Sequence, residues 1–474
     1  MKRILFLSLL LGSFNVAEGR IVLPPIFGNH MVLQQRSDVL LWGEATPGRR
    51  VVIRPSWGGH PVATRAGKDG RWSASVATPE AGGPHTMTIS DGKPLVLHDV
   101  LIGEVWFCSG QSNMEMPMAG KANQPVAEAA DCIAQADPAL PIRMFTVDQA
   151  GSRAPQQSCN GRWLSNDPVS VASTSAVGWF FANYLHRALG VPVGIIVSSW
   201  GGTAIEAWMN RETLAGFPEV DLSFLDDNTP VEKPKYRPTM LYNAMLAPLR
   251  GYAIRGFLWY QGESNRHEPA LYRRLLPAFV QMLRREWGRG ELPFYYVQIA
   301  PFAYEDATLA GTALVREAQL QALDDIPSSG MVVTMDLGDE GCIHPVRKRP
   351  VGERLARLAL AKSYGIQGFD PVSPRLRSME TADGRALLSF ECGPEGLAPL
   401  GVRFEGFEAA GADRRFYPAE AWIEKGTGRL IVTAPQVPEP VAVRYCFRNY
   451  AVGTLYNRFG VPVSSFRTDD WPVK

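Results

Sequence analysis

The strongest constraint on the fold is a change of hydrophobic pattern at Ile102. From there, apolar runs short enough for buried strands alternate with segments of helical period, which is typical of a parallel α/β sheet. The pattern predicts strands at Glu104–Cys108, Gly194–Ser199, Ile254–Tyr260, Phe294–Ala300 and Met331–Met335. It predicts helices at Leu271–Trp287 and Val351–Tyr364, the second of which stops at a glycine suited to a helix end.

The chain on either side of this α/β segment has a different texture. Short β runs separated by turn sequences indicate a small β-sandwich before it, at Val39–Trp42, Arg50–Ile53, Trp72–Val76 and Thr86–Ile89. Short runs return after it, at Ala386–Glu391, Leu430–Thr433 and Val441–Tyr445. We predict an accessory β-sandwich over 20–101, an α/β domain over 102–368 and a β-rich region over 369–474, either a third module or packed back on the first.

The first nineteen residues have the layout of a secretory signal. Lys2 and Arg3 precede the apolar run Ile4–Leu11, and small and polar residues follow as far as Gly19. That run is too short to span a bilayer, and no later segment is long and apolar enough. We therefore predict a signal peptide over 1–19 and a soluble, exported protein. The lack of an N-glycosylation sequon favours the bacterial periplasm, with secretion as the alternative.

The net charge limits the kinds of binding partner, and the cysteine content bears on possible disulfides. Forty-eight basic and 47 acidic residues leave a net charge of +1, which gives no reason to expect a nucleic acid or an anionic membrane. A neutral or locally charged small substrate fits better. Six cysteines in an exported chain could form disulfides, and a bridge between Cys132 and Cys159 is plausible from their loop-like surroundings. The oligomeric state stays open.

Ligands of an open parallel sheet bind at the carboxyl ends of its strands, and two loops there carry glycines beside reactive groups. Ser112, two residues after Gly110, could present an exposed hydroxyl as nucleophile and a backbone N–H as an oxyanion donor. The alternative is a serine that only caps a helix. Gly201 and Gly202 follow another strand, where a free N–H could be a second donor or the pair could be a simple turn.

Two further loops supply polar side chains. Gln261 could donate to an oxyanion and Glu263 could orient a histidine, although polar residues after a strand are often only solvated. His344 lies between Ile343 and Pro345 in the loop after the last strand, and a loop histidine is often merely exposed. Taken together, the four loops contain the nucleophile, base and donors that acyl transfer requires.

Several motifs, in the same order, resemble the sialate O-acetylesterase family of SGNH hydrolases: Gly110–Met116, Ser198–Trp208, Trp259–Asn265 and Ile343–Pro345, with Gly28–Gln35 and Phe466–Trp471 outside the α/β segment. The resemblance implies a flavodoxin-like three-layer α/β/α catalytic domain with added β domains. It also implies hydrolysis of acetyl esters on an acetylated glycan or sialic acid, without a metal or other cofactor.

The same resemblance assigns roles to individual residues. Ser112 corresponds to the nucleophile and His344 to the general base, while Gly201 or Gly202 and Gln261 match the oxyanion positions beside the Ser112 N–H. Many SGNH enzymes carry an aspartate three residues before the histidine, where this chain has a glycine. Related acetylesterases use the glutamate of a Gln-Gly-Glu loop, so Glu263 is the first choice of acid. Asp339 is the second, and a backbone carbonyl the third.

The sugar is less determined than the reaction. Four aromatic residues border the predicted catalytic loops and could stack on a sugar or belong to the core: Trp106, Trp200, Trp259 and Tyr260. No single arginine can be picked out for a sialic acid carboxylate, so sialate, acetylated xylan and other plant glycans stay open. A non-catalytic carbohydrate-binding protein on this fold is the alternative of another class, which the presence of both Ser112 and His344 opposes. A peptidase or lipase is a further alternative.

Overall fold

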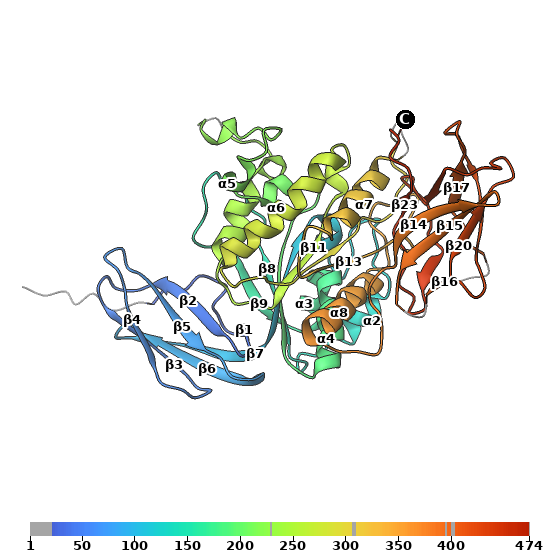
Figure 1. Cartoon of the computed structure of the whole chain (residues 1–474). Helices are drawn as coiled ribbons and strands as arrows, with labels where there is room; N and C mark the ends of the chain where they lie inside the picture. The colour runs from blue at the N-terminus through green and yellow to red at the C-terminus, as the bar shows by residue number, and fades with distance from the viewer. Residues whose placement is uncertain (1–20, 228–229, 306–309, 394–395, 400–402, 474) are drawn as a thin grey trace, which may run out of the picture.

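The structure is a computed structural model of the whole chain, and it describes residues 21–473 except 228–229, 306–309, 394–395 and 400–402. The predicted signal peptide lies outside the described residues. An α/β part forms the middle of the molecule, with the N-terminal strands at one end and the C-terminal strands at the other (Figure 1). No helix in the described ranges is long and apolar enough to cross a membrane.

A seven-stranded row in the order β13-β12-β11-β7-β10-β8-β9 forms the centre of the α/β part. Its strands are β7 (Pro94–Gly110), β8 (Ile142–Val147), β9 (Gly161–Ser165), β10 (Val193–Ser199), β11 (Gly256–Tyr260), β12 (Phe294–Val297) and β13 (Ser329–Val332). All neighbours run parallel except β8 and β9, which are antiparallel. The five predicted strands and the α/β class are confirmed, whereas β8 and β9 were not predicted.

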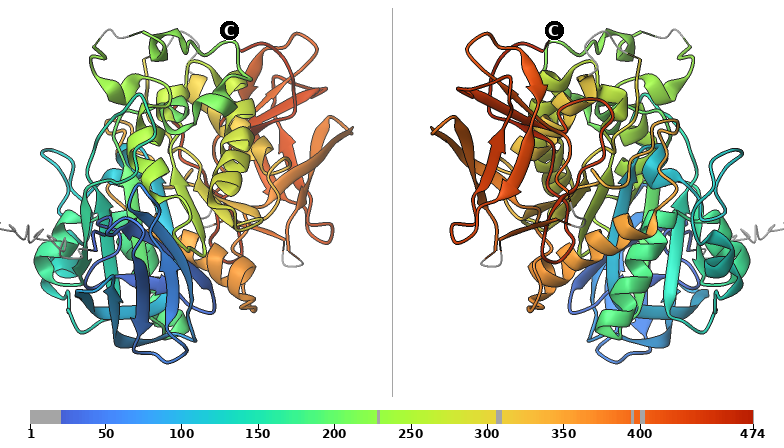
Figure 2. Two further views of the ribbon diagram at one scale, coloured as in Figure 1. Left: turned by 90° about the vertical axis from the view of Figure 1, so that its left-hand side faces the viewer. Right: turned by 90° about the vertical axis from the view of Figure 1, so that its right-hand side faces the viewer.

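Helices cover both faces of this row (Figures 1 and 2). Helices α4 (Ala176–Leu189) and α8 (Arg349–Tyr364) pack against each other, as do α6 (Pro269–Trp287) and α7 (Gly311–Ala322). Alternate side chains of β7 point into different cores: Trp106 packs with residues of α4 and α8, and Phe107 with residues of α6. The two predicted helices are confirmed as α6 and α8. Short helices lie in the connections, at α1 (Ser112–Glu115), α2 (Ala129–Ala134), α3 (Pro168–Ser173) and α5 (Arg211–Leu214).

The N-terminal strands are continuous with the central row through one long strand. They are β1 (Val32–Gln34), β2 (Asp38–Glu44), β3 (Arg50–Pro55), β4 (Val62–Arg65), β5 (Arg71–Ala77) and β6 (Gly82–Ser90). Strands β2 and β5 pair with each other, while β6 pairs with β7 between Pro94 and Ile102. From Glu104 onward, β7 pairs with β10. The four predicted strands are confirmed. The expected boundary at 101/102 falls inside β7, and the domain limits stay a prediction.

The C-terminal strands lie beside the α/β part, away from the N-terminal strands (Figures 1 and 2). One sheet has the order β14-β15-β20-β19, a second has β18-β17-β21-β23, and β16 pairs with β22. The strands of the first sheet are β14 (Arg375–Ala382), β15 (Arg385–Glu391), β20 (Leu430–Thr433) and β19 (Glu420–Ile423). Those of the second are β18 (Phe416–Pro418), β17 (Phe407–Ala410), β21 (Ala442–Tyr445) and β23 (Phe466–Arg467). The remaining pair is β16 (Leu397–Pro399) with β22 (Leu455–Asn457). The buried Arg316 of α7 joins the two parts by donating to Ser465 Oγ at 3.0 Å and to the Arg448 carbonyl. This region packs on the α/β part and not on the first strands.

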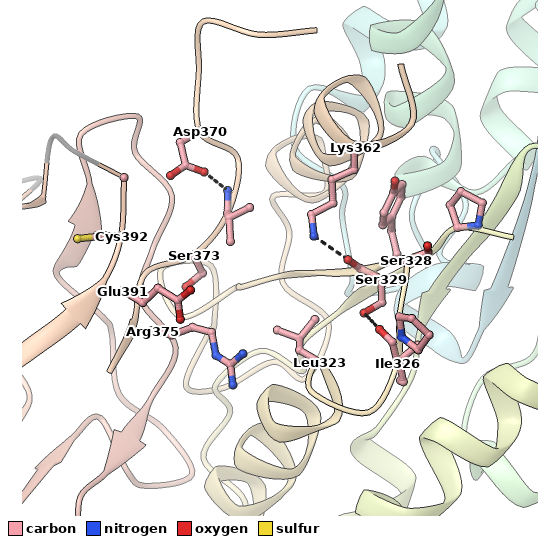
Figure 3. A pocket seen from close by; sticks show the side chains of 15 residues that line it. Leu323, Ile326, Ser328, Ser329, Lys362, Asp370, Ser373, Arg375, Glu391 and Cys392 are labelled. Atoms are coloured by element: carbon pink, nitrogen blue, oxygen red, sulfur yellow. Dashed lines mark hydrogen bonds between the residues drawn. The ribbon is translucent and has the colours of Figure 1, made fainter. Parts of the chain in front are cut away.

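A cavity of about 690 Å³ lies where the C-terminal region meets the amino ends of β12 and β13 (Figure 3). Its two basic side chains already have partners: Lys362 Nζ donates to the Ser329 carbonyl at 2.8 Å, and Arg375 pairs with Asp324 at 2.8 Å. Because it lies at the amino ends of these strands, the cavity is at the opposite end from the predicted catalytic loops.

All six cysteines are free thiols. The plausible bridge between Cys132 and Cys159 is wrong, because the two side chains pack against different hydrophobic clusters. Burial raises the pKa of both thiols, which keeps them protonated and unreactive.

Candidate active site

The strand order reverses at β7. After β7 the chain builds β8 and β10 on one side, and then β11, β12 and β13 on the other. A crevice forms at the carboxyl ends of the strands at such a reversal. Gly110, the last residue of β7, is level with Ser199 of β10 and Tyr260 of β11. Three of the predicted catalytic loops therefore start at the same height.

Gly110 makes the turn into α1 possible. Its φ is +140°, and a Cβ on it would lie 2.1 Å from the Tyr260 carbonyl oxygen. Only glycine fits this close approach between the two strands. The chain then enters α1 at Ser112, whose side chain is half-buried at the crevice.

A cleft of about 430 Å³ lies at this point, and it is lined by Ser112, Gly201, Gly202, Glu263 and His344. The loop after β13 carries His344 back across the ends of β12 and β11 to reach it. The structure therefore brings together five of the seven predicted site residues from four separate loops. Gln261 and Asp339 do not line the cleft.

His344 has the electrostatics of a neutral base. Burial, together with the positive charges of Lys348 and Lys121, lowers its pKa to about 4, and the negative charge of Glu115 opposes this shift. Its Nδ1 is buried without a hydrogen-bond partner among the described residues. No hydrogen bond joins its ring to the Ser112 hydroxyl within the described ranges, and such contacts often tighten only when substrate binds. At neutral pH the imidazole is free to accept a proton.

Glu263 has a free carboxylate oxygen that could accept a hydrogen bond from His344. It begins a 3-10 turn, Glu263–Asn265, and is 3% exposed. One carboxylate oxygen, Oε1, accepts from Asn113 Nδ2 at 2.7 Å, and Oε2 is buried with no partner in the described part of the chain. Burial raises the pKa of Glu263, while the Asn113 bond and the charge of Lys348 oppose that rise. Glu263 and His344, each with one buried and unpaired atom in the described part of the chain, thus line the same cleft.

Asp339 is occupied elsewhere. Its Oδ1 accepts from the backbone N–H groups of Gly341 at 2.8 Å and Cys342 at 3.0 Å. The side chain is exposed and shapes its own turn. This geometry favours Glu263 over Asp339 as the group that orients His344.

The predicted oxyanion donors differ in their surroundings. The Gly201 N–H donates to the carboxylate of Glu115, so it could serve an oxyanion only after that carboxylate moves. Gly202 adopts a φ of +77° and lines the cleft beside it. The Ser112 N–H is the first of α1 and has no acceptor within that helix.

Gln261 requires a correction. Its side chain is fully buried, and Nε2 donates to the Thr203 carbonyl at 3.1 Å and to Asn265 Oδ1 at 2.7 Å. Both amide hydrogens are used to join the second and third loops. The expected donation from Gln261 to an oxyanion does not fit this arrangement, because it would leave the buried Thr203 carbonyl unpaired, although Asn265 Oδ1 would keep its bond from the Ile205 N–H.

Sequence reasoning missed several polar residues of the site. Asn113 and Glu115 belong to the same motif as Ser112, and Lys348 comes four residues after His344. Closeness in sequence to the predicted nucleophile and base could therefore have identified them. Arg266 and Tyr304 also line the cleft, with the guanidinium 4.7 Å from the ring centre.

Of the four aromatic residues that border the loops, Trp106, Trp259 and Tyr260 are at most 1% exposed and belong to the core. Only Trp200 lines the cleft, so it alone of the four is placed to meet a sugar.

Known proteins resemble this chain over most of its length. A family model described as carbohydrate esterase, sialic acid-specific acetylesterase matches residues 102–361. The sialate O-acetylesterase of Homo sapiens is 30% identical over 399 residues, covering 76% of this chain and 74% of that protein. The sialate O-acetylesterase of Mus musculus is 29% identical over 420 residues, covering 76% and 77%. A crystal structure of a carbohydrate acetylesterase from Xanthomonas citri has a TM-score of 0.86 at 35% identity, covering 95% of this chain and all (100%) of that one.

Proposed function

Because this chain belongs to the carbohydrate esterase family of sialic acid-specific acetylesterases, we propose that it removes O-acetyl groups from sialic acids, with Ser112 as the nucleophile. It is a carboxylic ester hydrolase that acts on an acetylated carbohydrate. The observation that carries the proposed mechanism is the convergence of Ser112, His344 and the buried Glu263 on one cleft at the strand reversal. The same topology supports a flavodoxin-like SGNH three-layer catalytic domain.

The reaction follows from these groups. His344 takes the Ser112 proton as the hydroxyl attacks the acetyl carbonyl, and a tetrahedral oxyanion forms. The N–H groups of Ser112 and Gly202 stabilise it, joined by that of Gly201 once Glu115 has moved. Glu263 Oε2 accepts from His344 Nδ1 and stabilises the imidazolium. Protonated His344 then gives its proton to the leaving sugar oxygen, and water hydrolyses the acetyl-enzyme by the same route.

Acetate release from matched substrates tests the function. The panel is 9-O-acetyl sialic acid, acetylated xylan and acetylated mannan, each compared by kcat/KM. The proposal expects the highest value for the sialic acid. The highest value for xylan or mannan would overturn it in favour of a neutral plant-glycan acetylesterase, the second candidate. The similarity to the carbohydrate acetylesterase of Xanthomonas citri keeps that candidate in view.

One feature of the cleft favours an anionic sugar. Arg266 is the only arginine among the described residues that line the cleft, and its guanidinium rests on the Tyr304 ring. The cleft lysines are already engaged: Lys121 with Glu115, and Lys235 with the Gly201 carbonyl at 3.1 Å. A sialic acid carries a carboxylate that neutral acetylated sugars lack. Arg266 is the side chain placed to bind it with charge-assisted hydrogen bonds.

Replacing Arg266 with methionine is therefore expected to change the substrate preference. A charge-assisted contact contributes about 1.5–3 kcal/mol, so kcat/KM on 9-O-acetyl sialic acid should fall by about 10–100-fold. The rate on 4-nitrophenyl acetate, which has no carboxylate, should change little. Arg274→Met, whose guanidinium pairs with Glu219 outside the cleft, is the matched control. Equal losses on both substrates would rule out carboxylate recognition by Arg266.

Export is a separate proposal, supported by the basic start, apolar run and small residues of positions 1–19. Expression with the native N-terminus is expected to yield a periplasmic or secreted protein that begins near Arg20. If mass spectrometry finds the uncleaved chain in the cytoplasm, the export proposal is wrong.

A further inference from the structure

A buried lysine with no role in the reaction above stands behind the candidate acid. Lys348 is 1% exposed and directly precedes α8, and its Nζ donates to Asn113 Oδ1. The amide of Asn113 turns its other side to Glu263 Oε1 at 2.7 Å and to the Ile343 carbonyl at 3.2 Å. One asparagine thus joins the lysine to the carboxylate and to the residue before His344.

Within this chain of contacts, the lysine and the carboxylate stabilise each other's charged form. Burying a lysine ammonium or a carboxylate alone is costly, and burial accordingly lowers the pKa of Lys348 to about 7 and raises that of Glu263. Each charge opposes the shift of the other, and Lys348 is the basic residue that acts on Glu263. The ammonium also lowers the pKa of His344. One buried cation therefore favours the ionised acid and the neutral base together.

We propose that Lys348 is a positioning residue for catalysis: through Asn113 it holds the Glu263 carboxylate ionised and aimed toward His344. This rests on the proposed role of Glu263. The asparagine fixes Oε1 and leaves Oε2 for the histidine, while its bond to Ile343 ties the histidine loop to the same anchor. Lys348 does not line the cleft, so we expect it to affect the protonation of Glu263 and His344 and not the binding of substrate.

Several charged or titratable groups surround this cluster. Around His344 they are Lys348, Lys121 and Glu115. Around Lys348 they are Glu263 and Cys342. The charge of Glu263 contributes to raising the pKa of Tyr260, Tyr272 and Tyr304. The charge of Glu206 also raises the pKa of Tyr272, whereas those of Arg266 and Arg316 lower the pKa of Tyr304. Among these, Lys348 alone lowers the pKa of both Glu263 and His344.

The test is the pH profile of kcat/KM on 4-nitrophenyl acetate for wild type and Lys348→Met. The active form needs Glu263 ionised and His344 neutral, so activity is lost as pH falls through their pKa values. Removing the cation raises both pKa values, and the acidic limb should move upward by about one pH unit or more. The plateau rate should also fall, because Glu263 loses its anchor.

Lys362→Met is the matched control for the loss of a buried lysine. Lys362 also belongs to α8 and is also partly desolvated, with its amine on the Ser329 carbonyl in the cavity of Figure 3. It lies fourteen residues further along the helix, about 21 Å from Lys348 by helix geometry. This variant should keep both the wild-type rate and the wild-type acidic limb. A similar shift in both variants would overturn the proposal.

Double variants separate this proposal from the proposed role of Glu263. If Lys348 acts through Asn113 and Glu263, then Lys348→Met should cost little further activity in a Glu263→Gln background. Additive losses would mean that Lys348 supports the fold and not the acid. An active Glu263→Gln enzyme would instead refute the role of Glu263. Normal activity and an unshifted limb in Lys348→Met, with Glu263→Gln inactive, would refute only the role of Lys348.

Discussion

Ser112→Ala is expected to lower kcat on an acetyl ester by about 10⁶-fold, to the residual rate that the oxyanion donors alone support. The hydroxyl is the only serine oxygen placed both on the cleft with His344 and directly after the Gly110 turn, among the residues the structure describes. Ser264 also lines the cleft, but it follows Glu263 in the third loop, away from that turn. Among the described residues that line the cleft, Ser112 is therefore the group that we propose forms the acetyl-enzyme.

The loss should leave the fold intact, because the Ser112 side chain is only half-buried and the Gly110 turn does not depend on its hydroxyl. Equal thermal transitions for the two proteins check this. A fluorophosphonate should label the wild type at Ser112 and leave Ser112→Ala unlabelled, and Ser264→Ala should be labelled like the wild type. Turnover close to wild type in Ser112→Ala would end the serine mechanism and favour a binding protein or another nucleophile.

The second large effect is expected at the acid. Glu263→Gln should reduce kcat by about 10⁴-fold, because an amide that presents its NH₂ to Nδ1 favours the wrong imidazole tautomer and cannot stabilise the imidazolium. The substitution preserves shape, and its Oε1 can still accept from Asn113, so the turn Glu263–Asn265 should persist.

Asp339→Asn is the companion measurement, since Asp339 was the second choice for the acid. Its carboxylate accepts two backbone N–H bonds in an exposed turn, and an asparagine oxygen can accept the same bonds. The variant should therefore retain most of its activity. A greater loss in Asp339→Asn than in Glu263→Gln would transfer the role to Asp339. Small losses in both would favour a Ser–His dyad oriented by a backbone carbonyl.

Local patterns in the chain were enough to predict the scaffold of the site. Buried parallel strands read as apolar runs, so β7, β10 and β11 could be recognised, and the residues that follow them had to meet at the strand ends. Strand β9 was missed because Gly161–Ser165 mixes polar with apolar residues at a sheet edge, and strand β8 because Arg143 and Thr146 interrupt its apolar run.

The direction of each side chain depended on contacts distant in sequence. Gln261 follows a recognisable strand, yet Thr203 and Asn265 turn its amide into the protein. Lys348 comes before the predicted helix Val351–Tyr364, and only the fold places it against Asn113 from 235 residues earlier. The free Cys132 and Cys159 make the same point, since their packing followed from the layering of the whole molecule.

Strand β7 has a consequence for how this protein unfolds. Its first half belongs to the N-terminal sheet through β6, and its second half forms the middle of the catalytic row and ends at Gly110. A strand shared in this way offers no seam along which one sheet can separate while the other stays intact. We therefore expect the N-terminal strands and the turn that presents Ser112 to unfold as one cooperative unit, so that fraying at the edge of the molecule reaches the proposed nucleophile.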